Sequence, residues 1–433
     1  MSEPDAIVVG AGITGLTCAY RLQKLGFNTL VLERGDRIGG VIRTERINGH
    51  LIEFGPSSLL PTAHTHDLLK EFGLDEELLE ADPKAPRYIV VNGQLRAIPL
   101  GPLTLKGIAR AATEPLVRTK SNGDESIAGF FRRRFGPQIH DRLAAPFVTG
   151  IFAGDTEKLS VSSVFPRLVE MEQASGSIIL GMLRGRRKTT KSDTTRSMRR
   201  AVISSFPNGL ETLPRRIAEN LQVQTKCSGI RIGKDIRARA TILAVPAYGA
   251  SEILKELYPQ LATILDEIEY APIVVATTSV PLNSLSAPLR GFGFLTPRSE
   301  RMITLGTIFN SLLFPDRSPD DRLLFTSYLG GAIQPEVFDW PDERVWETVC
   351  SELKRVLKTS TLPEPVAIFR HRRAIPQYNI GHRQRIDAVA SELSRIPGLF
   401  VTGSFLHGVS IPACMEHGDN TAIAVSEFLR NTS

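Results

Sequence analysis

The feature that most constrains this chain is a glycine triplet set between two short apolar runs near the N-terminus. The run Ile7–Val9 has the unbroken apolar character of a parallel strand buried on both faces, and the motif Gly-x-Gly-x-x-Gly at 10–15 follows it directly. Apolar residues then recur at helical spacing until Gly26, and a second run, Thr29–Leu32, ends in Glu33. Strand, triplet, helix, strand and acid in this order predict a Rossmann-like cradle for the pyrophosphate of a dinucleotide.

Each part of this unit has a mechanical role. The glycines allow a tight turn and let the backbone approach the pyrophosphate, while the helix N-terminus offers unsatisfied N–H groups to the phosphates. Glu33 lies eighteen residues after Gly15 and can accept hydrogen bonds from the hydroxyls of the adenosine ribose. Its carboxylate would repel a 2′-phosphate, which disfavours NADP.

A second glycine-rich segment follows Glu33 and narrows the choice of dinucleotide. The segment 34–44, with Gly39, Gly40 and Arg43, resembles the second-glycine signature of the amine-oxidase-like flavoprotein superfamily. In that signature the glycine pair lets the chain pass close to the phosphates, and an arginine adds positive charge. A nicotinamide dehydrogenase does not need this extension, so FAD is the expected cofactor.

The C-terminal region is expected to complete the same site. Leu399–Gly403 is a strand pattern that ends in glycine, and Gly408–Ile411 precedes a helical pattern over 422–429. A helix starting there can direct its N–H groups at the O2/N1 edge of the flavin, where it stabilises negative charge. The segment 240–244 supplies a further strand, so the cofactor domain is predicted to be discontinuous.

Composition sets the broad class of the protein. The chain has 433 residues, enough for two or three domains, and its four cysteines lie far apart, which is typical of free thiols in a reducing compartment. No signal peptide or transmembrane run is expected.

The net charge of +6 comes from the segment 184–200, whose eight Lys/Arg and one Asp give +7 and leave the rest at −1. We therefore expect a solvated, mobile loop there and no nucleic-acid partner, with attraction to an anionic membrane as the alternative.

Further motifs, in order along nearly the whole chain, resemble those of the protoporphyrinogen oxidase family, which includes the coproporphyrinogen III oxidases. The segments that carry the resemblance are Glu53–Ser58, Lys84–Tyr88, Phe130–Gly136, Pro146–Asp155, Leu159–Ser160, Ser311–Arg317, Ala374–Tyr378 and Gly381–His382.

The resemblance implies an α/β fold in three parts. These are a Rossmann-like FAD-binding domain (1–85, 206–250 and 396–433), a mixed-sheet substrate-binding domain (86–104 and 251–395) and a helical insertion (105–205). The insertion is the part that meets the membrane in the family.

The implied activity is the oxidation of protoporphyrinogen IX to protoporphyrin IX in heme biosynthesis, with coproporphyrinogen III as the alternative substrate. Three two-electron steps would each return the flavin to its oxidised form with dioxygen and release hydrogen peroxide. Positioning in an apolar slot matters more here than a dedicated acid or base, so we expect no catalytic side chain and no metal. A flavin amine oxidase or desaturase, and a binding protein of the same fold without redox chemistry, are the rival interpretations.

Three residues are expected on the substrate side by motif position. Arg87 would pair with a propionate carboxylate, the backbone at Gly150 would lie against the macrocycle, and Phe314 would pack on a pyrrole ring. The residues expected to contact FAD are Gly10, Ala11, Gly12, Ile13, Thr14, Gly15, Glu33, Arg34, Gly39, Gly40, Val41, Arg43, Gly55, Pro56, Ser57, Ser58, Gly403, Val409, Ser410 and Ile411. We expect the FAD to be non-covalent, because 375–378 contains no cysteine.

Two departures from the family pattern and several partner expectations complete the prediction. The usual Ser-Gly of the C-terminal motif is His417-Gly418 here, and the helical insertion carries the basic segment without a long apolar surface. Expected partners are a tetrapyrrole substrate and dioxygen or another electron acceptor. The resemblance leaves a cytoplasmic or peripheral membrane location, a homodimer and a contact with ferrochelatase open.

Overall fold

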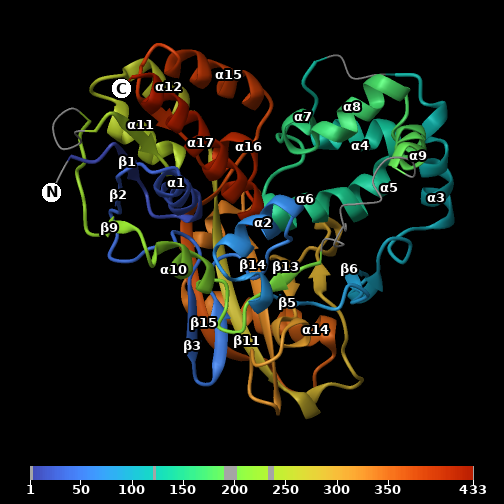
Figure 1. Ribbon diagram of the computed structural model, residues 1–433. Coiled ribbons are helices and arrows are strands. Elements are labelled where there is room, and N and C mark those ends of the chain that lie inside the picture. The colour runs from blue at the N-terminus through green and yellow to red at the C-terminus, as the bar shows by residue number, and fades with distance from the viewer. Residues whose placement is uncertain (1–2, 120–122, 190–201, 233–237, 433) are drawn as a thin grey trace.

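The computed structural model describes residues 3–119, 123–189, 202–232 and 238–432. Within them the chain forms three parts that meet at the centre of the molecule (Figure 1). One is a five-stranded sheet with helices on both faces, the second is a seven-stranded sheet, and the third is a group of helices. Both ends of the drawn chain lie on the first part.

The five-stranded sheet is entirely parallel. Its strands, in spatial order, are β16 (Leu399–Val401), β10 (Ala240–Leu243), β1 (Ala6–Val9), β2 (Thr29–Leu32) and β9 (Gln222–Gln224). Along β1, Val8 joins the core on one face and Ile7 and Val9 join the core on the other. Burial on both faces explains the unbroken apolar runs of the sequence.

Helices cover both faces of this sheet. One face carries α1 (Ile13–Lys24), α10 (Thr212–Ala218) and α17 (Ile411–Asn431), and the other carries α11 (Ala247–Leu254), α12 (Pro259–Asp266) and α15 (His382–Leu393). The expected α/β class is confirmed. The ranges expected for the substrate-binding domain include α12 and α15. In the structure, Leu265 of α12 and Ile386 of α15 pack instead in the core of the five-stranded sheet.

The seven-stranded sheet is mixed, with one parallel pair, β12 and β6. Its strands, in spatial order, are β15 (Glu364–Pro376), β11 (Tyr270–Pro281), β14 (Arg322–Gly330), β13 (Thr304–Ile308), β12 (Gly293–Leu295), β6 (Arg87–Val91) and β7 (Gln94–Ala97). One face packs on α14 (Asp342–Leu357) through Val349 and Leu353. The other face contributes Ile273 and Tyr328 to a small core that also includes Ala153, from the helical part.

The helical part is held together by a buried ion pair. Its helices are α3 (Leu105–Ala112), α4 (Ile127–Phe135), α5 (Pro137–Ile139), α6 (Ala145–Phe152), α7 (Val161–Val164), α8 (Pro166–Ser175) and α9 (Ile178–Thr189). Arg134 on α4 pairs with Glu114, and both side chains are fully buried. The Glu114 carboxylate also accepts hydrogen bonds from Ser177 Oγ and from the N–H groups of Ile178 and Ile179, at the start of α9. Burial opposes ionisation of Glu114, but these hydrogen bonds outweigh it and hold its pKa below the usual value.

The expectation of a loop over 184–200 is wrong at its first residues. Helix α9 continues to Thr189, so 184–189 are helical. Its N-terminus is held by the Glu114 carboxylate and by Ser177, whose Oγ accepts a hydrogen bond from Leu180 N–H, so charge content alone did not end the helix. Residues 190–200 lie outside the described part of the chain.

A buried glutamate joins the hairpin of β3 (Thr44–Ile47) and β4 (His50–Glu53) to the segment before α10. Glu53 accepts hydrogen bonds from Thr44 Oγ1 at 2.6 Å and from Leu210 N–H at 2.8 Å. Its side chain is almost wholly buried, and burial raises its pKa from 4.5 to about 7. The folded protein therefore holds a proton on Glu53 at a pH at which the unfolded chain has released it.

We expect this raised pKa to make the stability of the fold fall as the pH rises from 4.5 to about 7. A raised carboxyl pKa favours the folded state only while the group is protonated, and the full loss is roughly 3 kcal/mol. The variant Glu53→Gln cannot ionise, so its melting temperature should vary less over this window than that of the wild type. Thermal unfolding from pH 4.5 to 8 measures this. The exposed Glu77, changed to Gln, is the control and should keep the wild-type slope.

Candidate active site

The N-terminus of α1 lies at the carboxyl edge of the five-stranded sheet, directly after β1. Gly12 is the N-cap residue, and no side chain caps the first turn of the helix. A Cβ atom on Gly12 would point into open space, whereas one on Gly15 would lie 2.0 Å from the carbonyl oxygen of Gly10. Gly15 is therefore required by packing, while Gly12 leaves room in front of free N–H groups, where an anionic group can bind.

The second glycine segment lies on the first. Gly39 N–H donates to the carbonyl oxygen of Ala11 at 2.8 Å, and Gly12 and Gly39 form an isolated parallel bridge. Glu33, at the end of β2, accepts hydrogen bonds from Ala11 N–H at 2.9 Å and Gly35 N–H at 2.7 Å. The structure thus brings Glu33 and both glycine segments together at the N-terminus of α1.

The segment after β4 extends this wall toward the seven-stranded sheet. A Cβ on Gly55 would lie 2.1 Å from the carbonyl oxygen of Val41, so the two segments touch. Ser57 Oγ is 2.7 Å from the hydroxyl of Tyr328 on β14. Pro56 and Ser58 lie in the same segment and are half-buried. The hydrogen bond between Ser57 and Tyr328 joins the segment expected to contact the cofactor to the seven-stranded sheet.

The two arginines expected to contact FAD, Arg43 and Arg34, differ from each other in how firmly they are held. Arg43 lies over the rings of Phe54 and Phe369, at 5.0 and 5.5 Å from their centroids, and pairs with Glu45. Arg34 is exposed on the surface. The stacking fixes Arg43 beside the glycine segments, whereas packing does not constrain Arg34.

The C-terminal segment reaches the same edge of the sheet from β16. Gly403 follows β16, and Ser410 caps α17, which begins at Ile411; the Ser410 hydroxyl accepts a hydrogen bond from Ala413 N–H. Val409 packs with Phe152 and Tyr378 in the core of the helical part. A Cβ on Gly418 of α17 would lie 2.3 Å from the carbonyl oxygen of Thr14, so α17 packs directly on the first turn of α1. All four predicted cofactor segments therefore meet at one edge.

The meeting of these segments fits FAD. Open space before the uncapped N-terminus of α1 suits a pyrophosphate, and a carboxylate at the end of β2 suits a ribose. The N-terminus of α17, on the same face of the sheet as α1, adds a second set of helix N–H groups, which favours negative charge on a bound group.

The predicted substrate residues lie around β12. Arg87 begins β6 and pairs with Gly293 of β12, so both project to the same face of the sheet. Its side chain is exposed, and its guanidinium lies 5.6 Å from the ring centroid of Phe292. Within the described ranges no carboxylate forms an ion pair with Arg87. A guanidinium in this state is available for an external carboxylate.

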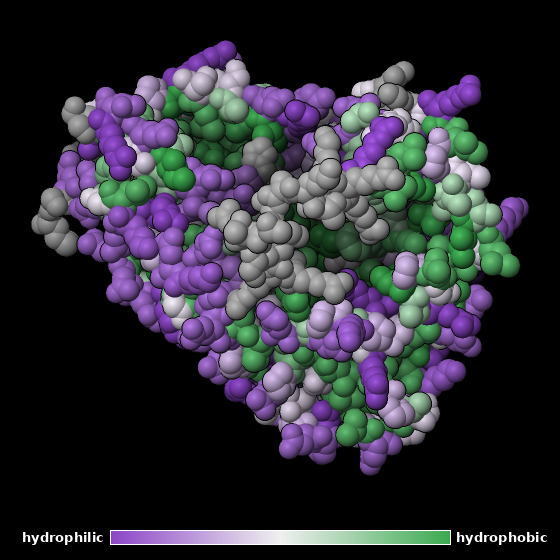
Figure 2. Space-filling model, turned by 45° about the vertical axis from the view of Figure 1, so that its right-hand side comes forward, coloured by the Kyte–Doolittle hydropathy of each residue, from purple (hydrophilic) through white to green (hydrophobic). Residues whose placement is uncertain are grey.

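Gly150 lies opposite this face, on α6. A Cβ on Gly150 would come within 2.5 Å of a methyl group of Leu295, two residues after Gly293. Phe147 and Ile151, one helical turn apart on α6 and next to Gly150, are 48% and 42% exposed. Figure 2 shows hydrophobic side chains gathered around a hollow where the helical part meets the sheet. This hollow, called the apolar slot below, lies where the helical part meets the sheet, and Arg87, on the strand next to β12, places a cationic side chain near it.

Phe314, which was expected to pack on a pyrrole ring of the substrate, is buried in the structure. Its ring is only 3% exposed and packs with Leu79, Ile203 and Phe292. The aromatic side chain that is half-buried next to Arg87 is Phe292, with Phe314 behind it. Contact between Phe314 and a macrocycle stays a prediction, and it requires the side chains covering the ring to move.

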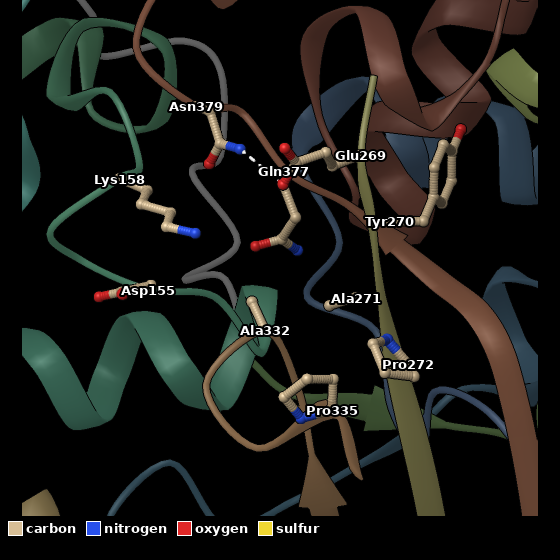
Figure 3. A pocket seen from close by; sticks show the side chains of 10 residues that line it. All are labelled: Asp155, Lys158, Glu269, Tyr270, Ala271, Pro272, Ala332, Pro335, Gln377 and Asn379. Atoms are coloured by element: carbon tan, nitrogen blue, oxygen red, sulfur yellow. Dashed lines mark hydrogen bonds between the residues drawn. The ribbon is translucent and has the colours of Figure 1, made fainter. Parts of the chain in front are cut away.

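A separate cavity of ≈ 180 Å³ lies between the end of the helical part and β11 (Figure 3). Polar groups line it: Asp155 accepts from Arg298 at 2.9 Å, and Glu269 accepts from Asn379 at 3.2 Å. Ligand sites for drug-sized molecules usually measure roughly 300–1,000 Å³ and have mostly apolar walls. This cavity is too small and too polar for a tetrapyrrole.

Comparison with known proteins agrees with this geometry. Residues 13–426 match the model of the family described as flavin containing amine oxidoreductase. The chain belongs to that family. A protoporphyrinogen oxidase of Spinacia oleracea is 32% identical over 99% of this chain and 85% of its own length. The coproporphyrinogen III oxidase of Bacillus subtilis is 29% identical over 99% and 98%. The predicted resemblance is confirmed, and the chain is a flavin-dependent oxidoreductase that uses FAD.

Solved structures share the fold. A protein from Exiguobacterium sp. 255-15, provisionally assigned as a protoporphyrinogen oxidase, aligns with a TM-score of 0.81 at 24% identity and covers 99% of both chains. A UDP-galactopyranose mutase aligns with a TM-score of 0.73 at 17% identity, over 98% of this chain and 96% of its own. None of the helices in the described ranges is long and apolar enough to cross a membrane.

The sequence analysis missed several residues of the site. Phe292 had a signal, since it stands between two glycines, Gly291 and Gly293. Phe147 and Ile151 could have been found from their spacing around Gly150 on one helix face. Tyr328, which hydrogen-bonds Ser57, had no local signal because strand pairing alone brings the two together.

Gly12 and Gly15 of the glycine triplet give a prediction about cofactor binding. Gly12→Ala should leave the fold and melting temperature of the flavin-free protein unchanged, because its Cβ points into open space, yet weaken FAD binding about tenfold or more. Gly15→Ala should lower both, because its Cβ meets the Gly10 carbonyl. Flavin absorbance per protein after dialysis, with thermal unfolding of the apoprotein, measures both effects. Normal flavin content in Gly12→Ala would contradict the placement of the pyrophosphate.

Proposed function

We propose that this protein oxidises protoporphyrinogen IX to protoporphyrin IX, with coproporphyrinogen III as the alternative substrate. The observation that carries the proposal is the apolar slot, the hollow where the helical part meets the seven-stranded sheet, with the guanidinium of Arg87 on the strand next to β12. Within the described ranges this guanidinium forms no ion pair. A porphyrinogen is a large apolar ring with carboxylate side chains, so its two chemical features match the two features of the slot. The names of the relatives agree with this choice.

In this proposal the chain binds and orients the substrate and supplies no acid or base. Arg87 holds a propionate, and the walls formed by Leu295 and the Phe147–Ile151 face hold the ring while excluding water. FAD, held by the two glycine segments and the start of α17, would supply the acceptor for a hydride from a bridging methylene of the substrate. The proton lost from a pyrrole nitrogen goes to solvent. Three such two-electron oxidations give the porphyrin, and three molecules of dioxygen take up the electrons and become hydrogen peroxide.

The FAD is proposed to be non-covalent. Cys414, the cysteine at the start of α17, is buried, and burial raises the pKa of its thiol to about 11. A protonated, buried thiol is a poor nucleophile. Acid precipitation should therefore leave the yellow colour in the supernatant, and colour in the pellet would overturn this proposal.

A peripheral membrane contact by an otherwise cytoplasmic protein is a further part of the proposal. The helical part exposes Leu105, Leu116 and Leu183, at 87%, 77% and 54%, with Lys106 and Arg184 beside them in sequence. Apolar side chains accompanied by cations favour an anionic lipid surface. The homodimer and the contact with ferrochelatase stay predictions from the resemblance.

Anaerobic mixing of the FAD-loaded protein with each porphyrinogen tests the activity. Loss of the oxidised-flavin absorbance followed by porphyrin fluorescence on admission of air is the expected result. The substrate that reduces the flavin faster at equal concentration is the physiological one. If neither porphyrinogen reduces the flavin, the proposed function is wrong.

The role of Arg87 gives a separate prediction. Arg87→Met should raise KM about 10- to 100-fold with little change in kcat, because a charge-assisted hydrogen bond contributes roughly 1.5–3 kcal/mol. The exposed Arg96 on the neighbouring strand β7, which hydrogen-bonds Gln94, is the matched control, and Arg96→Met should leave KM unchanged. Steady-state kinetics decide between them, and equal effects of the two changes would contradict the assignment.

A further inference from the structure

The side chain of Phe292 is packed between Arg87, the expected anchor for a substrate carboxylate, and the buried ring of Phe314. Its ring lies 5.6 Å from the Arg87 guanidinium and belongs to the small core that includes Phe314. The ring is half-buried, so one part of it faces the core while another supports Arg87.

The backbone holds this ring in place from several directions. Phe292 N–H donates to the carbonyl oxygen of Pro86 at 2.8 Å, and the Phe292 carbonyl accepts from Phe309 N–H at 3.0 Å. Gly293 follows with φ of +148°, and a Cβ there would lie 2.1 Å from the Thr307 carbonyl oxygen. The backbone of Phe292 is thus fixed to Pro86, the residue before Arg87, on one side and to Phe309, the residue after β13, on the other.

A fixed ring beneath a guanidinium restricts its movement without using any of its N–H donors. An arginine on a surface strand otherwise samples many rotamers and loses that freedom when it binds an anion. The attraction between the cation and the ring face favours the stacked rotamer before the anion arrives. Stacking uses none of the five N–H donors of the guanidinium, and no described residue accepts a hydrogen bond from them, so they are available for a carboxylate.

We propose that Phe292 is a positioning residue that holds Arg87 ready for a substrate carboxylate. The proposal rests on the proposed function and adds a specificity element to it: recognition of a carboxylate by a stacked cation. Phe292 itself does not contact the reacting atoms. It acts through Arg87, so its contribution depends on the carboxylate of the substrate and not on the ring.

The test compares Phe292→Leu and Phe292→Tyr in the FAD-loaded protein. Leu keeps apolar volume without an aromatic face, whereas Tyr keeps the face. KM and kcat are measured with protoporphyrinogen IX and with its dimethyl ester, and binding of protoporphyrin IX and its ester is measured by fluorescence. Phe338→Leu is the matched control, because Phe338 is also half-buried and lies 4.3 Å beneath the exposed Arg372.

We expect Phe292→Leu to raise KM and Kd for the free acid about threefold to thirtyfold, the range of a stacked cation. The ester, flavin content and kcat should be unchanged, and Phe292→Tyr should restore wild-type values. In an Arg87→Met background Phe292→Leu should add nothing. The control should match the wild type throughout.

Other outcomes overturn the proposal. Equal losses for acid and ester would make Phe292 a plain wall of the slot, and no loss for either would deny it a role. A wild-type protein that binds protoporphyrin IX normally but oxidises neither porphyrinogen rejects the proposed function alone, because the binding comparison still tests Phe292. A wild type that neither binds nor oxidises rejects both.

Discussion

The rest of the site depends on the free N–H groups at the start of α1. No side chain caps the first turn after Gly12, so these groups stay free, and they face open space because Gly12 has no Cβ. An uncapped helix end at the edge of a parallel sheet is unfavourable unless an anion or water occupies it. The second glycine segment and the start of α17 are arranged around this point. The cofactor is thus part of what completes this edge of the sheet.

The apolar slot, where we propose that the substrate binds, lies beside a close contact between elements that belong to separate parts. Gly150 lets α6 approach Leu295 on β12, and Arg87 stands on the next strand. Because the wall on one side is a helix and on the other a sheet, small changes in how the helical part sits would alter the width of the slot. The buried Arg134–Glu114 pair keeps that part rigid, since breaking such a pair costs several kcal/mol.

The sequence predicted the cofactor edge better than the substrate slot, for a physical reason. The strand, glycine and acid pattern of residues 7–33 is local, and the Glu33 carboxylate lies at the cradle, where it was expected. Phe314 was assigned by motif position, but packing by Leu79 and Ile203 buries its ring, and no local pattern encodes that contact. Phe292 escaped notice because its partner, Arg87, stands about 200 residues earlier and meets it only through strand pairing. The start of α9 is held by Glu114, which stands 64 residues before Ile178, so no local pattern shows that contact either.

The packing of α17 on α1 has a consequence for synthesis. Arg21 on α1 pairs with Asp419 on α17, although 398 residues separate them in the sequence. A ribosome makes α1 early, and its apolar face then has no α17 to cover it until nearly all the remaining residues have been added. During that interval the nascent chain presents a hydrophobic surface and cannot close the cofactor edge. FAD can therefore be held firmly only after the chain has emerged as far as α17.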